Sequence, residues 1–165
     1  GTFIGNKETE SDQILNKLLP NLGFDSAAGI RNNSHLRVWN GYSNLHGEGI
    51  VVIGDAASLC DPFLAEGLRP ALMSGYEAAN CLNHWLRGDI QTLESYTKVI
   101  NKKWGNSMTW GKRISQVFYR FPKVGYELGV KRPTAPKRIA QILSGKMGYG
   151  DIAQRVIKRL LFQKN

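Results

Sequence analysis

Residues 49–68 read GIVVIGDAASLCDPFLAEGL, and this stretch decides the fold that the sequence predicts. The run begins with four β-branched apolar residues between two glycines, which is typical of a central strand buried on both faces of a sheet. A loop, residues 55–67, follows this strand. Residues 68–85 then place apolar side chains at i, i+3, i+4 and i+7 spacing, which predicts a packed helix. The sequence therefore indicates the strand, loop and helix of an α/β sheet.

The segments before this unit give weaker signals. Residues 2–4 are expected to end a strand, and residues 12–19 have the apolar spacing of a short helix that Pro20 should stop. Residues 36–42 alternate apolar and polar side chains, as a half-buried strand does.

The segments after it are predicted to be helical. Pro70 falls in the first turn of the helix that starts at residue 68, and Gly88 is placed to close that helix. A second helix is expected to start at Thr92 as its N-cap and to run towards Phe121, with a break near Gly105 or Gly111. Three short basic helices should follow, at residues 123–128, at 136–143 behind Thr134, and at 152–162 behind Asp151.

Charge is divided unevenly along the 165 residues. The whole chain has a formal net charge of +9, from 22 Lys and Arg against 13 Asp and Glu. Residues 1–101 carry 7 cations and 11 anions, whereas residues 102–165 carry 15 cations and 2 anions. The basic character therefore belongs to the C-terminal part, and it is compatible with a nucleic acid, an anionic membrane, an acidic partner or simple solubility.

The two cysteines and the histidines do not form a metal-ligand pattern. Cys60 and Cys81 match no metal-binding spacing, and a disulfide between them is possible but has no support in the sequence. We therefore expect a reducing, cytoplasmic compartment. No apolar run reaches the ~18 residues that a membrane-spanning helix needs.

The residues that carry chemistry cluster around the predicted loop. A carboxylate such as Asp55, at the carboxyl end of a buried strand, points into the crevice where open α/β sheets bind ligands. The small residues Ala56 and Ala57 let the backbone approach a ligand. Gly67 opens a helix whose free amide hydrogens favour an anion or a polarised carbonyl.

This arrangement resembles the second FAD-binding motif of the flavoprotein hydroxylase superfamily and, within it, the geranylgeranyl reductase family. The features that match are a strand, Gly-Asp-Ala-Ala at 54–57, Pro62, Glu-Gly-Leu at 66–68 and a helix with Ser-Gly at 74–75 and Ala-Ala at 78–79. The resemblance covers about residues 46–155. One residue departs from the pattern, because Ala65 stands where the family usually has Gly.

The resemblance implies a flavin site. Asp55 would bind the ribityl chain of FAD, with Gly54 and Ala56 beside it. The Pro62 loop would line the isoalloxazine ring, and backbone amides near Gly67 and Leu68 would face the N1 and C2 carbonyl edge of the flavin. A reduced flavin carries negative charge at that edge, so a helix N-terminus stabilises it. No catalytic residue is assigned and no metal is expected.

The glycine fingerprint that cradles the FAD pyrophosphate is not found in residues 1–50. The expectation is therefore a C-terminal fragment of a Rossmann-like FAD-binding fold with a helical tail. Residues 1–45 would end the substrate domain and return to the cofactor domain, 46–88 would complete that domain, and 89–165 would form a basic helical region.

The leading functional hypothesis is an FAD-dependent oxidoreductase that reduces isoprenoid carbon–carbon double bonds, with NADPH or ferredoxin reducing the flavin. The cationic tail suggests peripheral association with an anionic membrane. One alternative is a flavin-dependent monooxygenase of the same superfamily. Another is a non-enzymatic basic helical module that binds a membrane or nucleic acid, although no recognition helix or RNA-binding signature is seen, so a nucleic acid is not expected.

Overall fold

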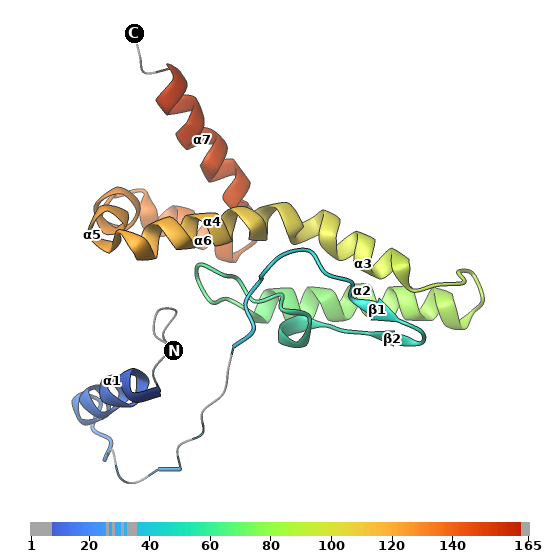
Figure 1. Cartoon of the computed structure of the whole chain (residues 1–165), viewed down its shortest axis with the longest axis horizontal. Coiled ribbons are helices and arrows are strands. Elements are labelled where there is room, and N and C mark those ends of the chain that lie inside the picture. The colour runs from blue at the N-terminus through green and yellow to red at the C-terminus, as the bar shows by residue number, and fades with distance from the viewer. Residues whose placement is uncertain (1–7, 26, 28, 31, 33–35, 163–165) are drawn as a thin grey trace. The chain divides into compact units, whose positions relative to one another are not determined.

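The computed structural model describes residues 8–162 except 26, 28, 31 and 33–35 (Figure 1). The predicted strand end at residues 2–4 lies outside the described residues. The chain divides into two units, residues 1–35 and residues 36–165. Each unit is considered by itself below.

The first unit contains the helix α1 (Glu8–Asn21), which confirms the predicted helix but is longer at both ends. The expectation that Pro20 stops it was wrong, because Pro20 lies inside the last turn. The end is made by Gly23, at φ 78°. The amides of Gly23 and Phe24 donate back to the carbonyls of Pro20 and Leu19, which is the pattern of a glycine-capped helix end.

The second unit contains a small antiparallel hairpin. Strand β1 (His46–Gly47) pairs with β2 (Ile50–Val51), with His46 opposite Val51. The predicted strand buried on both faces is corrected here, since Ile50 is 63 % exposed and Ile53 is also exposed. Val51 and Val52 pack against the core, so the stretch is covered on one side only. The apolar run correctly predicts that one face of this stretch is buried. No described residues cover its other face.

Residues 36–42 form a single bridge instead of the expected strand. Val38 makes a parallel bridge to Cys60, and the Trp39 amide donates to the Cys60 carbonyl at 2.9 Å. Trp39 is buried, whereas Leu36 and Tyr42 are exposed. The segment therefore contributes one large side chain to the core and has no continuous ladder.

Helix α2 (Leu68–Leu86) confirms the clearest helical prediction. Pro70 lies in its first turn, and Gly88, at φ 79°, closes its end as expected. The predicted packed stripe is confirmed at Ala78, but it was wrong at Leu68, Leu72 and Ala79, which are exposed. The other buried positions of the helix are Pro70, Ser74 and Cys81.

The next helical stretch is continuous from α3 (Glu94–Ile100) through a widened turn at Asn101–Gly105 into α4 (Asn106–Arg120) (Figure 1). The break expected near Gly105 or Gly111 was wrong, because the helix widens at Gly105 without being interrupted. The Thr92 cap was wrong, because Leu93 precedes the first helical residue and no side chain caps it. The predicted inner face is confirmed, since these side chains are all buried: Leu93, Tyr96, Ile100, Trp104 and Met108.

Three more helices follow. Figure 1 shows α5 (Pro122–Gly125) at the far end of α4, where it continues into a wide turn at Tyr126–Val130. Helix α6 (Ala135–Leu143) has no side-chain cap from Thr134. Helix α7 (Tyr149–Phe162) begins earlier than predicted, and Asp151 lies inside it, where its carboxylate accepts the Gly148 amide at 2.9 Å.

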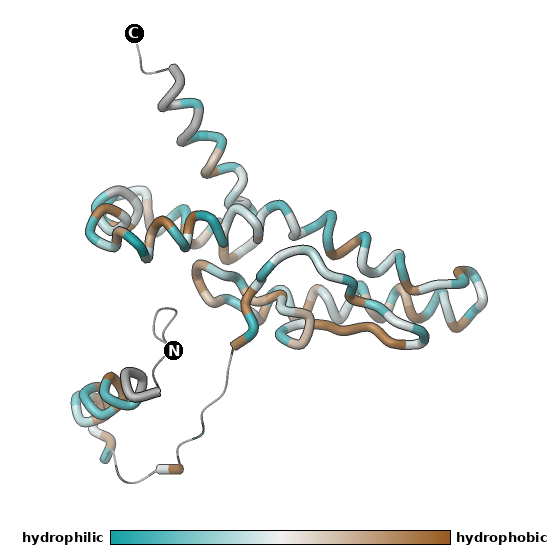
Figure 2. The backbone as a smooth tube through the Cα atoms, in the orientation of Figure 1, coloured by the Kyte–Doolittle hydropathy of each residue, from teal (hydrophilic) through white to brown (hydrophobic). Residues whose placement is uncertain are grey.

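The described chain is mostly helical, with one two-stranded sheet. Its main core gathers side chains from the segments before and after the hairpin, from α2 and from the helical stretch of α3 and α4, namely Trp39, Leu45, Ala57, Leu59, Ala78, Cys81, Leu93, Tyr96, Ile100, Trp104 and Met108. Figure 2 shows a continuous hydrophobic run along β2 and the residues directly after it. Within the described residues, no helix combines the length and the apolar character that crossing a membrane requires.

Candidate functional site

The loop of residues 55–67 is held against the first turns of α2. Gly54 has φ 54° and its amide donates to the Ser74 hydroxyl at 3.0 Å. A Cβ atom at Gly54 would lie 3.1 Å from the Cβ of Ala71. Only glycine therefore combines this backbone conformation with so close an approach to α2.

The structure brings two of the predicted site residues together. A Cβ atom at Gly67 would lie 3.0 Å from Oδ1 of Asp55, so the Asp55 carboxylate lies against the start of α2. Asp55 and Ala56 sit in a short 3₁₀ turn, Gly54–Ala57, and both are exposed. Ser58, at φ 54°, ends that turn. The carboxylate is therefore accessible to a ligand hydroxyl.

The N-terminus of α2 presents donors beside this carboxylate. No side chain caps the helix at Gly67. The amides of Gly67 and Leu68 donate to no acceptor within the part of the chain that the structure describes. The next amide, that of Arg69, donates a hydrogen bond to the Glu66 carboxylate at 2.7 Å. Two amide hydrogens and the positive end of the helix dipole thus remain for an anionic or carbonyl group.

Ala65 adopts a backbone conformation that glycine reaches more easily than alanine does. Its φ is 55°, in the left-handed region. The Ala65 amide donates to the Asp61 carbonyl and the Asp61 amide to the Glu66 carbonyl, so the turn is closed by hydrogen bonds. The backbone keeps this turn in spite of the alanine, at a steric cost of about 1 kcal/mol.

Asp61 anchors the middle of the loop. Its Oδ1 accepts the amides of Phe63 and Leu64 at 2.7 and 2.8 Å, and its Oδ2 accepts the hydroxyl of Tyr149 at 2.8 Å. The side chain is buried. With both oxygens occupied, Asp61 holds the loop in shape and is not available to a substrate. Sequence reasoning could not see Tyr149, because 88 positions separate it from Asp61.

The C-terminal helices hold the same loop by aromatic contacts. Phe63 lies within a cluster with Phe118, Tyr119 and Tyr149, at ring-centroid distances of 5.2, 6.2 and 5.9 Å. The Tyr119 hydroxyl donates to the Phe63 carbonyl at 3.0 Å. Pro62 is buried, and a Cβ atom at Gly111 of α4 would lie 3.5 Å from its ring. The Pro62 ring therefore packs against α4.

Cys60 lies beneath the site but does not supply a reactive thiolate. Burial raises the pKa of its thiol to about 11, and the neighbouring carboxylates of Asp55, Asp61 and Glu66 act in the same direction. The thiol stays protonated at neutral pH, and both cysteines are free. The carboxylate cluster holds no set of three metal-ligating side chains, as far as the structure describes the chain.

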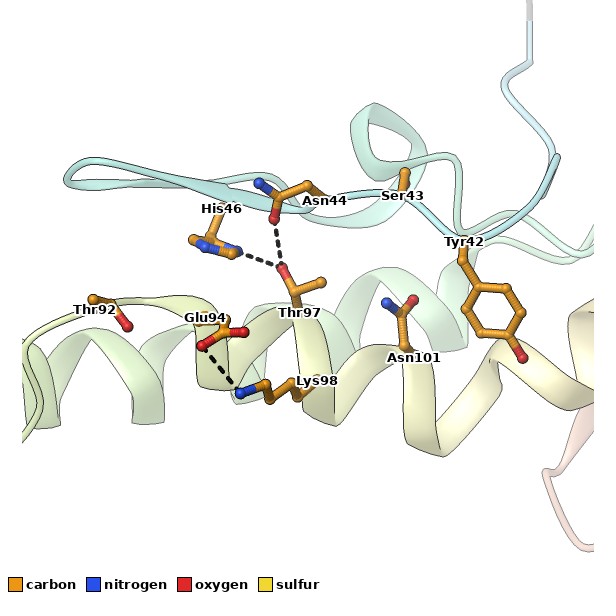
Figure 3. Close-up of a pocket in the computed structure, with 9 residues that line it drawn as sticks. All are labelled: Tyr42, Ser43, Asn44, His46, Thr92, Glu94, Thr97, Lys98 and Asn101. Carbon is orange, nitrogen blue, oxygen red and sulfur yellow. Dashed lines mark hydrogen bonds and ion pairs between the residues drawn. The ribbon is translucent and has the colours of Figure 1, made fainter.

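An open pocket of about 590 Å³, lined by residues with polar groups, lies between the hairpin segment and α3 (Figure 3). His46 Nδ1 and the Thr97 hydroxyl are hydrogen-bonded at 2.7 Å, and the Thr97 hydroxyl also lies 3.3 Å from Oδ1 of Asn44, to which it donates. The Oδ1 atom of Asn101 is buried without a hydrogen-bond partner among the described groups. Sequence analysis missed this pocket because its polar residues share no motif. None of the six predicted flavin-site residues lines it.

Comparison with known proteins adds no assignment: no family model, no curated protein and no solved structure matches this chain.

Proposed function

We propose that the chain supplies one side of the flavin site of an FAD-dependent oxidoreductase similar to the geranylgeranyl reductase family. The observation that carries the proposal is the exposed Asp55 carboxylate lying against Gly67, where the amides of Gly67 and Leu68 have no described partner. An acceptor for a sugar-alcohol hydroxyl and two donors for an anionic ring edge thus stand on one loop. These are the two kinds of group that the ribityl chain and the N1 edge of a flavin require.

The residues present fit such a cofactor in a specific way. Asp55 would accept hydrogen bonds from ribityl hydroxyls, and the start of α2 would stabilise negative charge on the ring. Bound FAD supplies the hydride chemistry, while this chain binds and orients the ring edge. Asp61 holds the turn that leads into these amides, through the amides of Phe63 and Leu64 and through its own amide, which donates to the Glu66 carbonyl at 2.8 Å; this support lowers the cost of ordering the site on binding.

An exposed apolar face supports the view that a further part of the cofactor domain packs here. Ile53 of the hairpin segment and Leu72 and Tyr76 of α2 are exposed next to the candidate site. Large neighbouring apolar side chains of this kind mark an interaction surface. A strand and a glycine-rich turn bearing the pyrophosphate site would cover this face and complete the Rossmann-like fold.

The proposed substrate is an isoprenoid whose carbon–carbon double bond takes up the hydride, with NADPH or ferredoxin as the source of electrons. An isoprenoid is held by apolar area, so few polar residues mark its site. The protein would work in the cytoplasm, where Cys60 and Cys81 stay reduced.

The first test is the coding sequence upstream of Gly1. A strand followed by Gly-x-Gly-x-x-Gly and a helix in the same reading frame, with an acidic residue about 20 positions later, is expected. A stop codon directly before Gly1 would contradict the proposal. The 165-residue chain alone should bind FAD poorly, so stoichiometric yellow protein from it would show that the site lies elsewhere.

The second test uses the protein made from the complete reading frame. Asp55→Ala should raise the FAD dissociation constant by about 10-fold or more, because a charge-assisted hydrogen bond is lost. The matched control is Glu48→Ala, which removes an exposed carboxyl group in the turn of the hairpin. Equal FAD affinity in both variants would contradict the role of Asp55 in binding FAD. Reduction of a geranylgeranyl substrate in the absence of oxygen tests the reaction.

A further inference from the structure

The end of α4 and the short helix after it form a second exposed surface, which we call the tip and define as residues 117–132. Five large apolar side chains of the tip are between 42 % and 64 % exposed: Val117, Phe121, Val124, Tyr126 and Val130. Figure 1 places α5 at the opposite end of this unit from the turn that joins α2 to α3. In Figure 2 hydrophobic and hydrophilic residues alternate along this end.

The tip is also basic. It contains Arg120, Lys123, Lys131 and Arg132 against a single acidic residue, Glu127. Glu127 is paired with Lys131 at 3.0 Å. The acid therefore offsets only one of the cations, and the surface has a clear positive excess beside its apolar side chains.

The tip has a defined shape on the end of α4. A Cβ atom at Gly125 would lie 2.5 Å from the ring of Phe118, so α5 packs closely on the inner face of α4. The Gly125 amide donates to the Phe121 carbonyl at 2.9 Å, and the Lys131 amide to the Tyr126 carbonyl at 2.9 Å. The apolar side chains are thus presented by a fixed backbone.

The apolar face of α2 is a useful contrast. Leu68, Leu72 and Tyr76 are exposed there as well, but their charged neighbours are mixed: the carboxylates of Asp55 and Glu66 lie near Arg69, and Glu77 is paired with Lys103. That face therefore has no positive excess that would attract an anionic surface. Exposed apolar side chains coincide with excess positive charge at the tip.

We propose that the tip docks on anionic phospholipid membranes, its valine, phenylalanine and tyrosine side chains entering the interface while its cations bind the headgroups. Aliphatic side chains gain nothing from nucleic-acid phosphates, whereas they gain burial at a lipid interface. Tyrosine is suited to the same interface because it has an apolar ring and a polar end. This surface does not depend on the flavin assignment.

The test is binding of the 165-residue chain to vesicles of phosphatidylcholine with about one quarter phosphatidylglycerol, measured by co-sedimentation. Binding should be much weaker on pure phosphatidylcholine and should weaken with salt. Neutralising Lys123 and Arg132 to Gln should lower the partition coefficient by about fivefold per cation. The control Arg87→Gln with Lys102→Gln removes the same charge from exposed positions outside the tip and should have a smaller effect.

Insertion is tested separately from attraction. Val124→Cys labelled with an environment-sensitive fluorophore should shift to the blue on anionic vesicles, whereas the same label at Leu86→Cys, an exposed residue of α2, should not. The native cysteines are buried, so labelling is selective. Phe121→Ser should reduce vesicle binding severalfold and Leu86→Ser should not.

Three results would overturn the proposal. They are the absence of binding to anionic vesicles, equal effects of tip and control substitutions, and a Val124 label that remains in water. Binding of a duplex RNA or DNA that depends on the tip cations but is indifferent to Phe121→Ser would assign the surface to a nucleic acid instead. Circular dichroism of each variant confirms that the helices are retained.

Discussion

The loop of residues 55–67 and the tip of residues 117–132 both lie at the C-terminal end of α4, but they are built in opposite ways. The middle of the loop has its polar groups paired, because Asp61 accepts two hydrogen bonds from loop amides and one from Tyr149 of α7. The tip exposes apolar side chains and cations. Neighbouring residues of α4 serve both regions: Phe118 packs on Phe63, while Val117 is exposed.

This difference indicates how the effects of substitutions distinguish a cofactor site from a docking surface. A site that must hold a cofactor edge needs fixed backbone groups, so changes in its supports should reduce stability. A surface that meets a fluid partner needs exposed groups, so changes there should affect binding alone. The predictions below test this contrast.

The largest effect is expected from Asp61→Ala. It removes the acceptor of two backbone amides and of the buried Tyr149 hydroxyl, so the free energy of unfolding should fall by about 3 kcal/mol. Urea unfolding measures this. The control Asp89→Ala, at an exposed residue paired with His84, should cost less than about 1 kcal/mol. Equal losses in the two variants would mean that the loop is not anchored by Asp61.

A smaller loss is expected from Tyr149→Phe. The ring and its packing against Phe63 remain, but Oδ2 of Asp61 loses its donor inside the protein, which costs about 1 to 2 kcal/mol. Burial first, and then Asp61, raise the pKa of Tyr149, so this hydroxyl stays a donor across the usual pH range. Tyr126→Phe, at an exposed tip residue, is the matched control and should leave the unfolding midpoint unchanged.

The next effect depends on pH. Burial raises the pKa of Cys60 from 9.0 to about 11 and that of Tyr96 from 10.0 to about 12. Both groups bind protons more tightly when folded, so their contribution is complete below pH 9 and is lost as the pH rises towards 12. The urea midpoint should fall across this window. Tyr96→Phe should reduce the part of the fall between pH 10 and 12, and an unchanged curve would contradict the burial of this hydroxyl.

The sequence predicted the helices better than the sheet. Helical spacing placed the inner face of α3 and α4, from Leu93 to Met108, because each turn of a helix repeats the same burial. The apolar run of β2 could not show that Ile50 and Ile53 are exposed here. Burial of a strand on both faces depends on neighbours elsewhere in the fold, which a local pattern does not contain.

The candidate site was predictable in its local part only. Asp55 and Gly67 lie on one short loop, and their spacing indicated that they belong together. The hydrogen bond from Tyr149 to Asp61 joins residues 88 positions apart, and it depends on the packing of α7 on α4. The pocket at His46 and Thr97 also joins distant segments. Long-range polar contacts leave no periodic signal in a single sequence.

Ala65→Gly should stabilise the loop by about 1 kcal/mol. The residue has φ 55°, which glycine adopts without the steric cost that alanine has, although glycine also gains freedom in the unfolded chain. Thermal unfolding measures the gain. Ala79→Gly, inside α2, is the matched control and should destabilise by roughly the same amount. A loss at both positions would show that the turn at Ala65 is not left-handed in solution.

The smallest effect on stability is expected at the tip, from Val124→Ser. The side chain is exposed, and Val and Ser have similar helix propensities, so the free energy of unfolding should change by less than about 0.5 kcal/mol. Ile142→Ser places the same small polar side chain at a buried position of α6 and should cost about 2 kcal/mol or more. A large loss of unfolding free energy in Val124→Ser would mean that the tip is packed against another part of the protein. The tip would then have a structural role and would not be a docking surface. Unchanged stability combined with reduced vesicle binding is the result that separates the two regions.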